Sequence, residues 1–283
     1  MKHGTAAVIG LTAFTLFAGG CAGNIAYTLS MLGGEPLIMA TVGDDYQPYE
    51  YRLQKLKLAR QHIRKIPNTF TAQAFITTDL DDNQITAFHP GAMNHSHENH
   101  VQEAKDVKLG IIAPDGREGM LQHAREFHAA GVPFVFDPGQ GLPMFSGEEL
   151  MRFVDMASYV AVNDYEGGML QERTGAKIEE LAKLVRAFVV TLGARGSLIH
   201  VNGKRIEIPC VKAEEVVDPT GCGDAFRAGL LYGIATELDW PLTGRLASLL
   251  GAIKIAKRGG QNHHFTRDEI AQRFKESFGI RIW

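Results

Sequence analysis

The sequence contains few cysteines and no long apolar or basic segment. Its 283 residues include three cysteines, Cys21, Cys210 and Cys222, whose spacing matches neither a disulfide framework nor a metal-binding motif. No apolar run approaches the ~20 residues of a membrane-spanning helix. Twenty-nine basic residues are balanced by 32 acidic ones, and no basic stretch points to nucleic acid. We therefore expect a cytoplasmic globular protein with neither nucleic acid nor membrane as a partner.

The first 23 residues leave an alternative localisation to consider. Lys2, the apolar residues after it and the segment Ala-Gly-Gly-Cys at 18–21 resemble a bacterial lipoprotein signal. Thr12 and Thr15 interrupt the apolar stretch, however, and a helical pattern follows Cys21 without a polar tether. The cytoplasmic interpretation is therefore favoured over export.

Short apolar segments alternate with segments of helical periodicity along the chain. Strands are expected at 6–10, 37–42, 109–113, 134–137, 159–163 and 188–192, and helices at 22–32, 46–56, 116–130, 224–236, 242–257 and 267–278. This alternation predicts an α/β fold with a mostly parallel central sheet and helices on both faces. Ligands of such sheets bind beyond the C-terminal ends of the strands. Because no linker or repeat is present, we expect one domain spanning residues 1–283.

Two hairpins are also predicted. Segments 197–201 and 205–208 flank Asn202-Gly203, a pair typical of a type I′ turn. Segments 70–77 and 84–89 flank Asp81-Asp82-Asn83 and have the alternation of paired strands.

The most informative segment is Asp-Pro-Thr-Gly-Cys-Gly-Asp at 218–224, which precedes an apolar helix rich in small residues. Its glycines allow consecutive N–H groups to point into one concavity, and the helix N-terminus adds a partial positive charge. The result is an anion hole with the carboxylate of Asp224 at its rim. Phosphoryl transfer needs both parts, one for the charge of the moving group and one for the proton of the acceptor hydroxyl. A loop with an ordinary helix cap is the alternative for the short motif alone.

The longer string Asp-x-Thr-Gly-x-Gly-Asp-Ala-Phe-x-Ala-Gly at 218–229 resembles the signature of the ribokinase-like (PfkB) family of carbohydrate and nucleoside kinases. The resemblance implies that Asp224 is the catalytic base and that Gly221, Cys222 and Gly223 supply the anion hole. Family members often have alanine where this chain has Cys222. Because the backbone N–H groups matter there, the difference should be tolerated.

Three further elements follow the family order. The resemblance implies that Asn163 and Glu166 organise Mg²⁺ and its waters, although the same residues suit a plain helix start. It implies that ATP contacts the loop at 191–196 and the later loop at 259–264; the contact residues are Thr191, Gly193, Gly196 and Asn262. In related kinases Asp218, Thr220 and carbonyls of the later loop can also hold K⁺.

On the acceptor side, the resemblance implies that Gly19, Gly20 and Asn24 contact a polyhydroxylated substrate; a tight turn before a helix is the alternative. Phe88 and Met93, together with Phe75, are expected to form an apolar wall for a base. The match is most detailed with bacterial adenosine kinases of the family. It implies transfer of the ATP γ-phosphoryl group to the 5′-hydroxyl of adenosine, a step of purine salvage.

Two alternatives to an adenosine kinase remain. A ribokinase or fructokinase of the same family would use a free sugar, which needs no apolar wall. A nucleoside-binding protein without catalysis is the second, and the intact Asp224 and Glu166 argue against it. Neither a Walker A motif nor the protein-kinase motif set occurs, which excludes two other designs for phosphoryl transfer.

Two polar segments have no firm assignment. The histidines at 89, 95, 97 and 100 raise the hypothesis of a metal site, but they lack the spacing and partners of a zinc motif. A polar loop is favoured there. Asp137-Pro138-Gly139-Gln140 follows a strand and could contact the acceptor or only form a turn; both interpretations stay open.

The segment 11–18 departs from the family pattern. Family members usually place an acid after the first strand and then insert a small β lid, which also supports a homodimer. Eight residues span at most ~29 Å, too little for a lid strand and its return, and none of them is acidic. The small lid is therefore reduced or partly missing. Either this protein has lost that part, or a segment is omitted from the sequence. Residues 11–17 read like fragments of a longer segment, which favours the second alternative.

Overall fold

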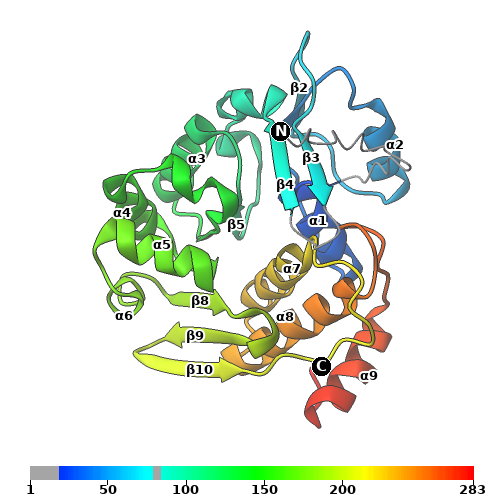
Figure 1. The fold of residues 1–283 in the computed structure, drawn as a ribbon, viewed down its shortest axis with the longest axis vertical. Coiled ribbons are helices and arrows are strands. Elements are labelled where there is room, and N and C mark those ends of the chain that lie inside the picture. Colours follow the sequence, from blue (N-terminus) through cyan, green and yellow to red (C-terminus); the bar gives the residue numbers. More distant parts are fainter. Residues whose placement is uncertain (1–18, 79–83) are drawn as a thin grey trace, which may run out of the picture.

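The computed structural model describes residues 19–78 and 84–283 (Figure 1). The predicted strand at 6–10 and the segment 11–18 lie outside these residues. Within them, six strands form a central sheet in the order β10-β9-β8-β7-β6-β5. Strands β5 to β8 pair in parallel, and β9 pairs antiparallel with both β8 and β10. The strands are β5 (Gly110–Ile112), β6 (Phe134–Phe136), β7 (Tyr159–Asn163), β8 (Ala187–Thr191), β9 (Ser197–Val201) and β10 (Lys204–Ile208).

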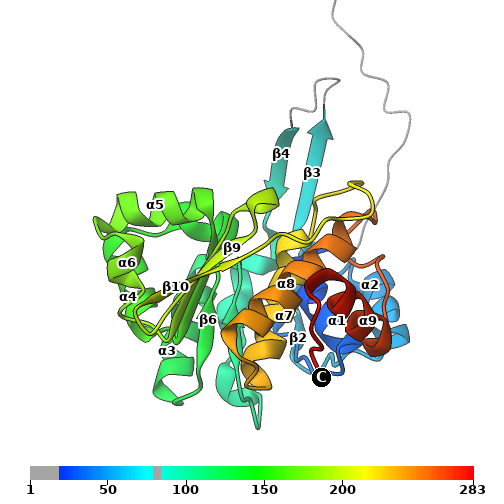
Figure 2. The same ribbon diagram turned by 90° about the horizontal axis from the view of Figure 1, so that it is seen from below.

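Helices cover both faces of this sheet, as its alternating side chains require. Phe134 and Phe136 point into a core with α3 (Arg117–Ala129), α4 (Gly147–Met156) and α5 (Asp164–Thr174). Val135, between them, points to the opposite core with α1 (Cys21–Met31), α7 (Cys222–Ala235) and α8 (Trp240–Ile255). The two groups of helices lie on opposite faces of the sheet (Figures 1 and 2). Two further helices are α6 (Ile178–Leu181) and α9 (Arg267–Phe278), of which α9 packs on α8. The predicted α/β class is confirmed.

The predicted elements match the observed ones closely. The four parallel strands begin and end within one residue of their expected limits, and six of the helices within two residues. Asn202 and Gly203 have φ angles of +51° and +72°, the left-handed conformation that a type I′ turn requires. The β9–β10 hairpin is therefore formed by the local signal that predicted it.

A smaller lobe precedes the sheet in sequence. It contains β1 (Ala40–Val42), which pairs in parallel with β2 (Ile63–Lys65), and α2 (Gln47–Lys55). Strand β2 was not predicted, because its sequence Ile-Arg-Lys is short and charged. The hairpin of β3 (Gln73–Thr78) and β4 (Gln84–His89) projects away from the rest of the molecule (Figure 2).

The remaining short elements are 3₁₀ turns in the connections after β4, β6 and β8. They are η1 (Gly91–Glu98), η2 (Val101–Glu103), η3 (Gly139–Met144) and η4 (Gly193–Arg195). Over the described residues, no helix combines the length and apolarity needed to cross a bilayer. The three cysteines are free thiols, as expected.

Candidate active site

The residues of the predicted anion hole lie at the first turn of α7. Gly221 is its N-cap and has a φ of +80°, a left-handed conformation that glycine adopts without strain. A side chain at Gly221 would also approach the Cα of Gly260 to 3.1 Å. Gly223 is exposed, with open space in front of it. Because the first N–H groups of a helix have no acceptor within it, those of Gly223 and Asp224 are available to an anion.

Asp224 lies in the same turn and is held by α1. The side-chain amide of Asn24 donates a hydrogen bond of 2.8 Å to Oδ2 of Asp224. Burial raises the pKa of Asp224, while the bond from Asn24 opposes that rise. The thiol of Cys21 also faces this carboxylate, and burial keeps it protonated by raising its pKa well above the usual value. The carboxylate is thus partly desolvated and oriented, as a proton acceptor should be.

Asn24 is itself fixed by a second amide. Its Oδ1 accepts a hydrogen bond of 3.0 Å from Nε2 of Gln261, which also donates to the hydroxyl of Tyr49 at 2.8 Å. Arg52, on α2, donates to both oxygens of Gln261. The sequence pointed to Asn24 as a substrate contact, whereas here both ends of its amide are bonded to protein. Gln261 was missed, because nothing local distinguishes it from its exposed neighbour Asn262.

A buried ion pair lies beside Asp224. Arg227, one turn along α7, donates to Oδ1 of Asp137 at 2.9 Å, and both side chains are less than 10 % exposed. The Nε and Nη1 atoms of Arg227 have no hydrogen-bond partner among the described residues. Asp137, whose role the sequence left open, is thus the hydrogen-bonded counter-charge of Arg227. The only local sign of Arg227 was a charge inside an otherwise apolar helix.

Asn163 and Glu166 form a capping box where β7 ends and α5 begins. Oδ1 of Asn163 accepts from the Glu166 N–H at 2.7 Å, and Oε2 of Glu166 accepts from the Asn163 N–H at 2.8 Å. Burial raises the pKa of Glu166, and the charge of Asp137 adds to that rise while Arg227 opposes it. The pair is therefore a helix cap whose carboxylate also faces the Asp137–Arg227 pair.

The loop after β8 is adjacent to this cap. Asn163 and Thr191 are paired across β7 and β8, so both mark the C-terminal edge of the sheet. Gly193 begins η4 and Gly196 follows it; a 2.8 Å bond from Leu192 N–H to the Gly196 carbonyl closes the turn. Parallel sheets bind ligands at this edge. Arg195, which had no assignment, is exposed and pairs with Asp164.

The later loop runs from the end of α8 toward Gln261. Asn262 is exposed; its side chain donates to the carbonyl of Arg258 at 2.8 Å, and its Oδ1 accepts from Arg52 at 3.4 Å. Gly260 packs against Asn24 with no room for a side chain. The loop that was expected to cover the nucleotide is therefore tied to the residue that holds Asp224.

The acceptor-side residues are less closely grouped. Gly20 is the N-cap of α1, and its carbonyl accepts from the N–H of Asn24 at 3.0 Å; Gly19 precedes it and is exposed. Met93 lies in η1 and is half-buried. Phe88 lies on β4 and is 54 % exposed.

The expected wall of Phe75, Phe88 and Met93 needs correction. In the β3–β4 hairpin Phe75 pairs with Ala87, and Phe88 pairs with Ala74. Because successive residues of a strand point to opposite faces, Phe75 and Phe88 lie on opposite sides of the hairpin. Only one of the two phenylalanines can face a ligand bound on a given side.

The residues expected to hold K⁺ are bonded to the protein instead. The carbonyl of Asp218 accepts a hydrogen bond of 2.7 Å from Nζ of Lys254, a buried lysine that the sequence reasoning missed. The two carboxylate oxygens of Asp218 accept from the N–H groups of Thr220 (2.9 Å) and Gly259 (2.7 Å). Burial alone would raise the pKa of Asp218, but these N–H groups and the Lys254 charge hold it below the ordinary value.

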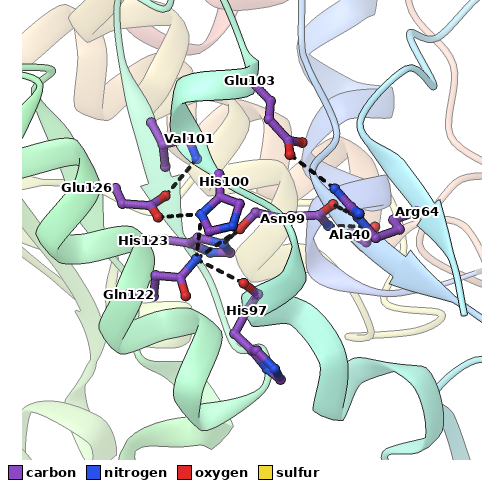
Figure 3. Close-up of polar contacts among 10 residues, drawn as sticks. All are labelled: Ala40, Arg64, His97, Asn99, His100, Val101, Glu103, Gln122, His123 and Glu126. Carbon is purple, nitrogen blue, oxygen red and sulfur yellow. Dashed lines mark hydrogen bonds and ion pairs between the residues drawn. The ribbon is translucent and has the colours of Figure 1, made fainter.

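The histidine-rich segment is a polar loop that hydrogen bonds hold against α3 (Figure 3). Oε1 of Glu126 lies 2.7 Å from Nδ1 of His100, and Gln122 donates to the carbonyls of His97 and Asn99. Within the part of the chain that the structure describes, no three His, Cys, Asp or Glu side chains are grouped to hold a metal ion. The polar-loop interpretation is therefore favoured over a metal site.

Asn99 extends this loop to the smaller lobe. Its side chain accepts from Nε of Arg64 at 3.1 Å and donates to the carbonyl of Ala40 at 3.0 Å, while its own carbonyl lies 2.9 Å from Nε2 of His123 (Figure 3). Burial lowers the pKa of His123, which keeps this ring neutral. The contacts link β1, β2 and α3.

Comparison with known proteins agrees with this geometry. Residues 5–266 match the sequence pattern of the pfkB family of carbohydrate kinases. The nucleoside kinase of Methanocaldococcus jannaschii is 31 % identical over 262 residues, which cover 92 % of this chain and 86 % of that protein. The structure of Burkholderia thailandensis nucleoside kinase in complex with inosine is 56 % identical, with a TM-score of 0.91 over 93 % of this chain and 87 % of that one. Its complex with ADP-inosine covers 99 % and 90 % at 52 % identity and a TM-score of 0.89. This chain therefore belongs to the pfkB family of carbohydrate kinases and is a phosphotransferase that acts on a hydroxyl group.

Proposed function

We propose that this protein is a nucleoside kinase that transfers the γ-phosphoryl group of ATP to the 5′-hydroxyl of a purine nucleoside, with adenosine as the expected acceptor. The observation that carries the proposal is the carboxylate of Asp224, held by Asn24 in the first turn of α7. The two complexes of the Burkholderia thailandensis nucleoside kinase, with inosine and with ADP-inosine, support a nucleoside acceptor and an adenine nucleotide donor. A cytoplasmic role in purine salvage is part of the same proposal.

In this mechanism Asp224 accepts the proton of the 5′-hydroxyl as the oxygen attacks the γ-phosphorus. The N–H groups of Gly221, Gly223 and Asp224 stabilise the negative charge on the transferring group, and the dipole of α7 adds to that effect. The N–H of Cys222, which the sequence also pointed to, donates instead to the carbonyl of Pro219 at 3.0 Å. Asn24 keeps Asp224 oriented, and its bond to Gln261 links the base to the loop that covers the nucleotide. Positioning and electrostatics then supply most of the acceleration, as is usual for phosphoryl transfer.

The remaining residues bind the two substrates. We assign the nucleotide to Thr191, Gly193, Gly196 and Asn262, and the acceptor to Gly19, Gly20, Phe88 and Met93. Phe88 is exposed enough to stack on a base, which a free sugar would not use. Residues 1–283 then work as one kinase domain, with the β3–β4 hairpin as the remaining lid. The homodimer expected from the sequence stays a prediction, which sedimentation analysis can test.

Glu166 and Asn163 suit Mg²⁺ held through water. Both present oxygen atoms at the C-terminal end of β7, and a hard cation that keeps several waters needs few protein ligands. Burial and the nearby charge of Asp137 raise the pKa of Glu166, so a cation in front of this carboxylate would stabilise its ionised form. When bound, the ion would neutralise charge on the phosphates of ATP.

An assay of ADP release with adenosine, inosine, ribose and fructose as acceptors tests the proposal. We expect turnover with the nucleosides and little with the free sugars. Turnover with a sugar alone would instead make the protein a sugar kinase, in line with the 27 % identical ribokinase of Lactococcus lactis. If no acceptor is phosphorylated but adenosine binds in a calorimeter, the protein is a nucleoside-binding protein.

A further inference from the structure

One lysine is completely buried next to the anion hole. Lys254, in the last turn of α8, has an exposed fraction of 0 %. Its Nζ donates to the carbonyl of Asp218 at 2.7 Å and to the carbonyl of Lys257 at 3.1 Å, and lies 4.0 Å from Oδ2 of Asp218. A buried ammonium group is costly unless oxygen atoms surround it. These three oxygens therefore form a cation site, and the side chain of Lys254 supplies the cation.

The oxygens around Lys254 include those expected to bind K⁺. The family resemblance places that ion on Asp218, Thr220 and carbonyls of the loop at 259–264. Here the ammonium occupies the carbonyl of Asp218 and that of Lys257, two residues before the loop, and the Asp218 carboxylate is already bonded to two N–H groups. A K⁺ ion sharing these oxygens would lie next to a like charge in a poorly solvated place. The residues present do not fit a K⁺ site.

We propose that the ammonium group of Lys254 is the resident monovalent cation of this enzyme and makes it independent of K⁺. An ammonium group and a K⁺ ion carry the same charge and have similar radii, so one can replace the other among carbonyl oxygens. The cation also lies at the C-terminal end of α8, where the partial negative charge of the helix stabilises it. The inference deepens the proposed function, on which its activity measurement rests.

The position of Lys254 explains what the cation holds together. The N–H groups of Val217 and Asp218 donate to the carbonyl of Ile255 at 2.9 and 3.0 Å, so the segment before the anion hole lies against the end of α8. Lys254 adds a charged contact between the same two segments. Asp218 in turn accepts from the N–H of Gly259, next to the loop that reaches Asn24. Lys254 therefore positions both the anion hole and the loop that covers the nucleotide.

The test compares monovalent cations at equal ionic strength. Thermal unfolding and ADP release of the wild type are measured in NaCl, KCl and NH₄Cl, and we expect differences of no more than about twofold in kcat. Lys254→Ala should unfold at a lower temperature in NaCl and regain both stability and kcat in KCl or NH₄Cl, because the ion enters the space left by the side chain. Lys254→Met fills that space and should not be rescued. The control is Lys275→Ala, an exposed lysine in the last turn of α9.

Two results would overturn the inference. One is an increase in the kcat or the Tm of the wild type on changing Na⁺ to K⁺ that is as large as the increase expected for Lys254→Ala. The other is a Lys254→Ala protein that responds to neither K⁺ nor NH₄⁺. If Lys254→Ala does not fold, the comparison of cations on the wild type decides the question. Thermal unfolding needs no turnover, so failure of this inference and failure of the proposed kinase activity are distinguishable.

Discussion

The side-chain amide of Asn24, in α1, donates a hydrogen bond of 2.8 Å to Oδ2 of Asp224, in α7, although 200 positions separate them in the sequence. The amide is itself held by Gln261, which is buried between α1 and α2. The carboxylate of Asp224 is thus oriented by a chain of hydrogen bonds from three parts of the polypeptide. The predictions below follow from this arrangement and its surroundings.

Asp224→Asn should lower kcat by about 10²–10⁴-fold, because it removes the proton acceptor and keeps the anion hole. Binding of ADP, measured by calorimetry, should be close to that of the wild type. Asp239→Asn is the control, since asparagine replaces aspartate as the N-cap of α8 with little cost. Near-normal kcat in Asp224→Asn would remove Asp224 from the role of base.

Asn24→Ala should move the acidic limb of the pH profile of kcat/KM to higher pH. The base works only when ionised, and burial already raises the pKa of Asp224. The bond from Asn24 lowers that pKa, so its loss lets the pKa rise further. The profile is measured by ADP release between mildly acidic and neutral pH. A limb at the wild-type position would show that Asn24 does not act on Asp224.

Gly260→Ala should reduce kcat/KM by up to about 10²-fold, because an added methyl group would displace the Asn24 amide that orients the base. That methyl would lie 2.6 Å from Nδ2 of Asn24, well inside contact distance. Gly251→Ala is the matched control: its methyl would approach only the carbonyl of Cys222, at 3.7 Å, from within α8. Equal kinetics for the two variants would argue against a rigid contact between Gly260 and Asn24.

Asp137→Ala should cost about 3–5 kcal/mol of the free energy of unfolding, since it leaves the buried Arg227 without its hydrogen-bonded counter-charge. Asp164→Ala breaks a similar pair with Arg195, whose side chains are 53 % and 70 % exposed. Its cost should be about 0.2–1 kcal/mol, because water screens exposed pairs. Urea unfolding of both variants gives the comparison. Similar losses in the two would mean that Arg227 is solvated when unpaired.

Asp115→Asn should flatten the pH dependence of stability. Burial raises the pKa of Asp115 from 3.8 to about 7. Between these two values the folded state therefore keeps a proton that the unfolded state releases. The proton on Asp115 stabilises the folded state fully below the unfolded-state pKa, and this stabilisation is lost as the pH rises through the folded-state pKa. As the pH rises from the unfolded-state pKa to the folded-state pKa, the Tm of the wild type should fall relative to the Tm of Asp115→Asn. Parallel Tm curves would contradict the raised pKa.

Much of the fold could be predicted because its signals are local. The run Phe-Val-Phe at 134–136 is apolar on both faces of a strand, so it indicates a buried parallel strand wherever it lies in the sheet. Asn202-Gly203 forms its turn from its own backbone preferences. The strand β2 escaped prediction because its pairing with β1, rather than its charged sequence, makes it a strand.

The sequence by itself determined the family, the α/β class and the motif around Asp224, because these depend on residues that are adjacent along the chain. Only the tertiary structure decided what holds Asp224, which partner neutralises Arg227 and which cation lies on Asp218. Those contacts join residues 200, 90 and 36 positions apart. The physical reason is that a buried charge or amide is stabilised by whatever group the folded chain brings next to it, and this depends on the packing of α1, α7 and α8 against the sheet.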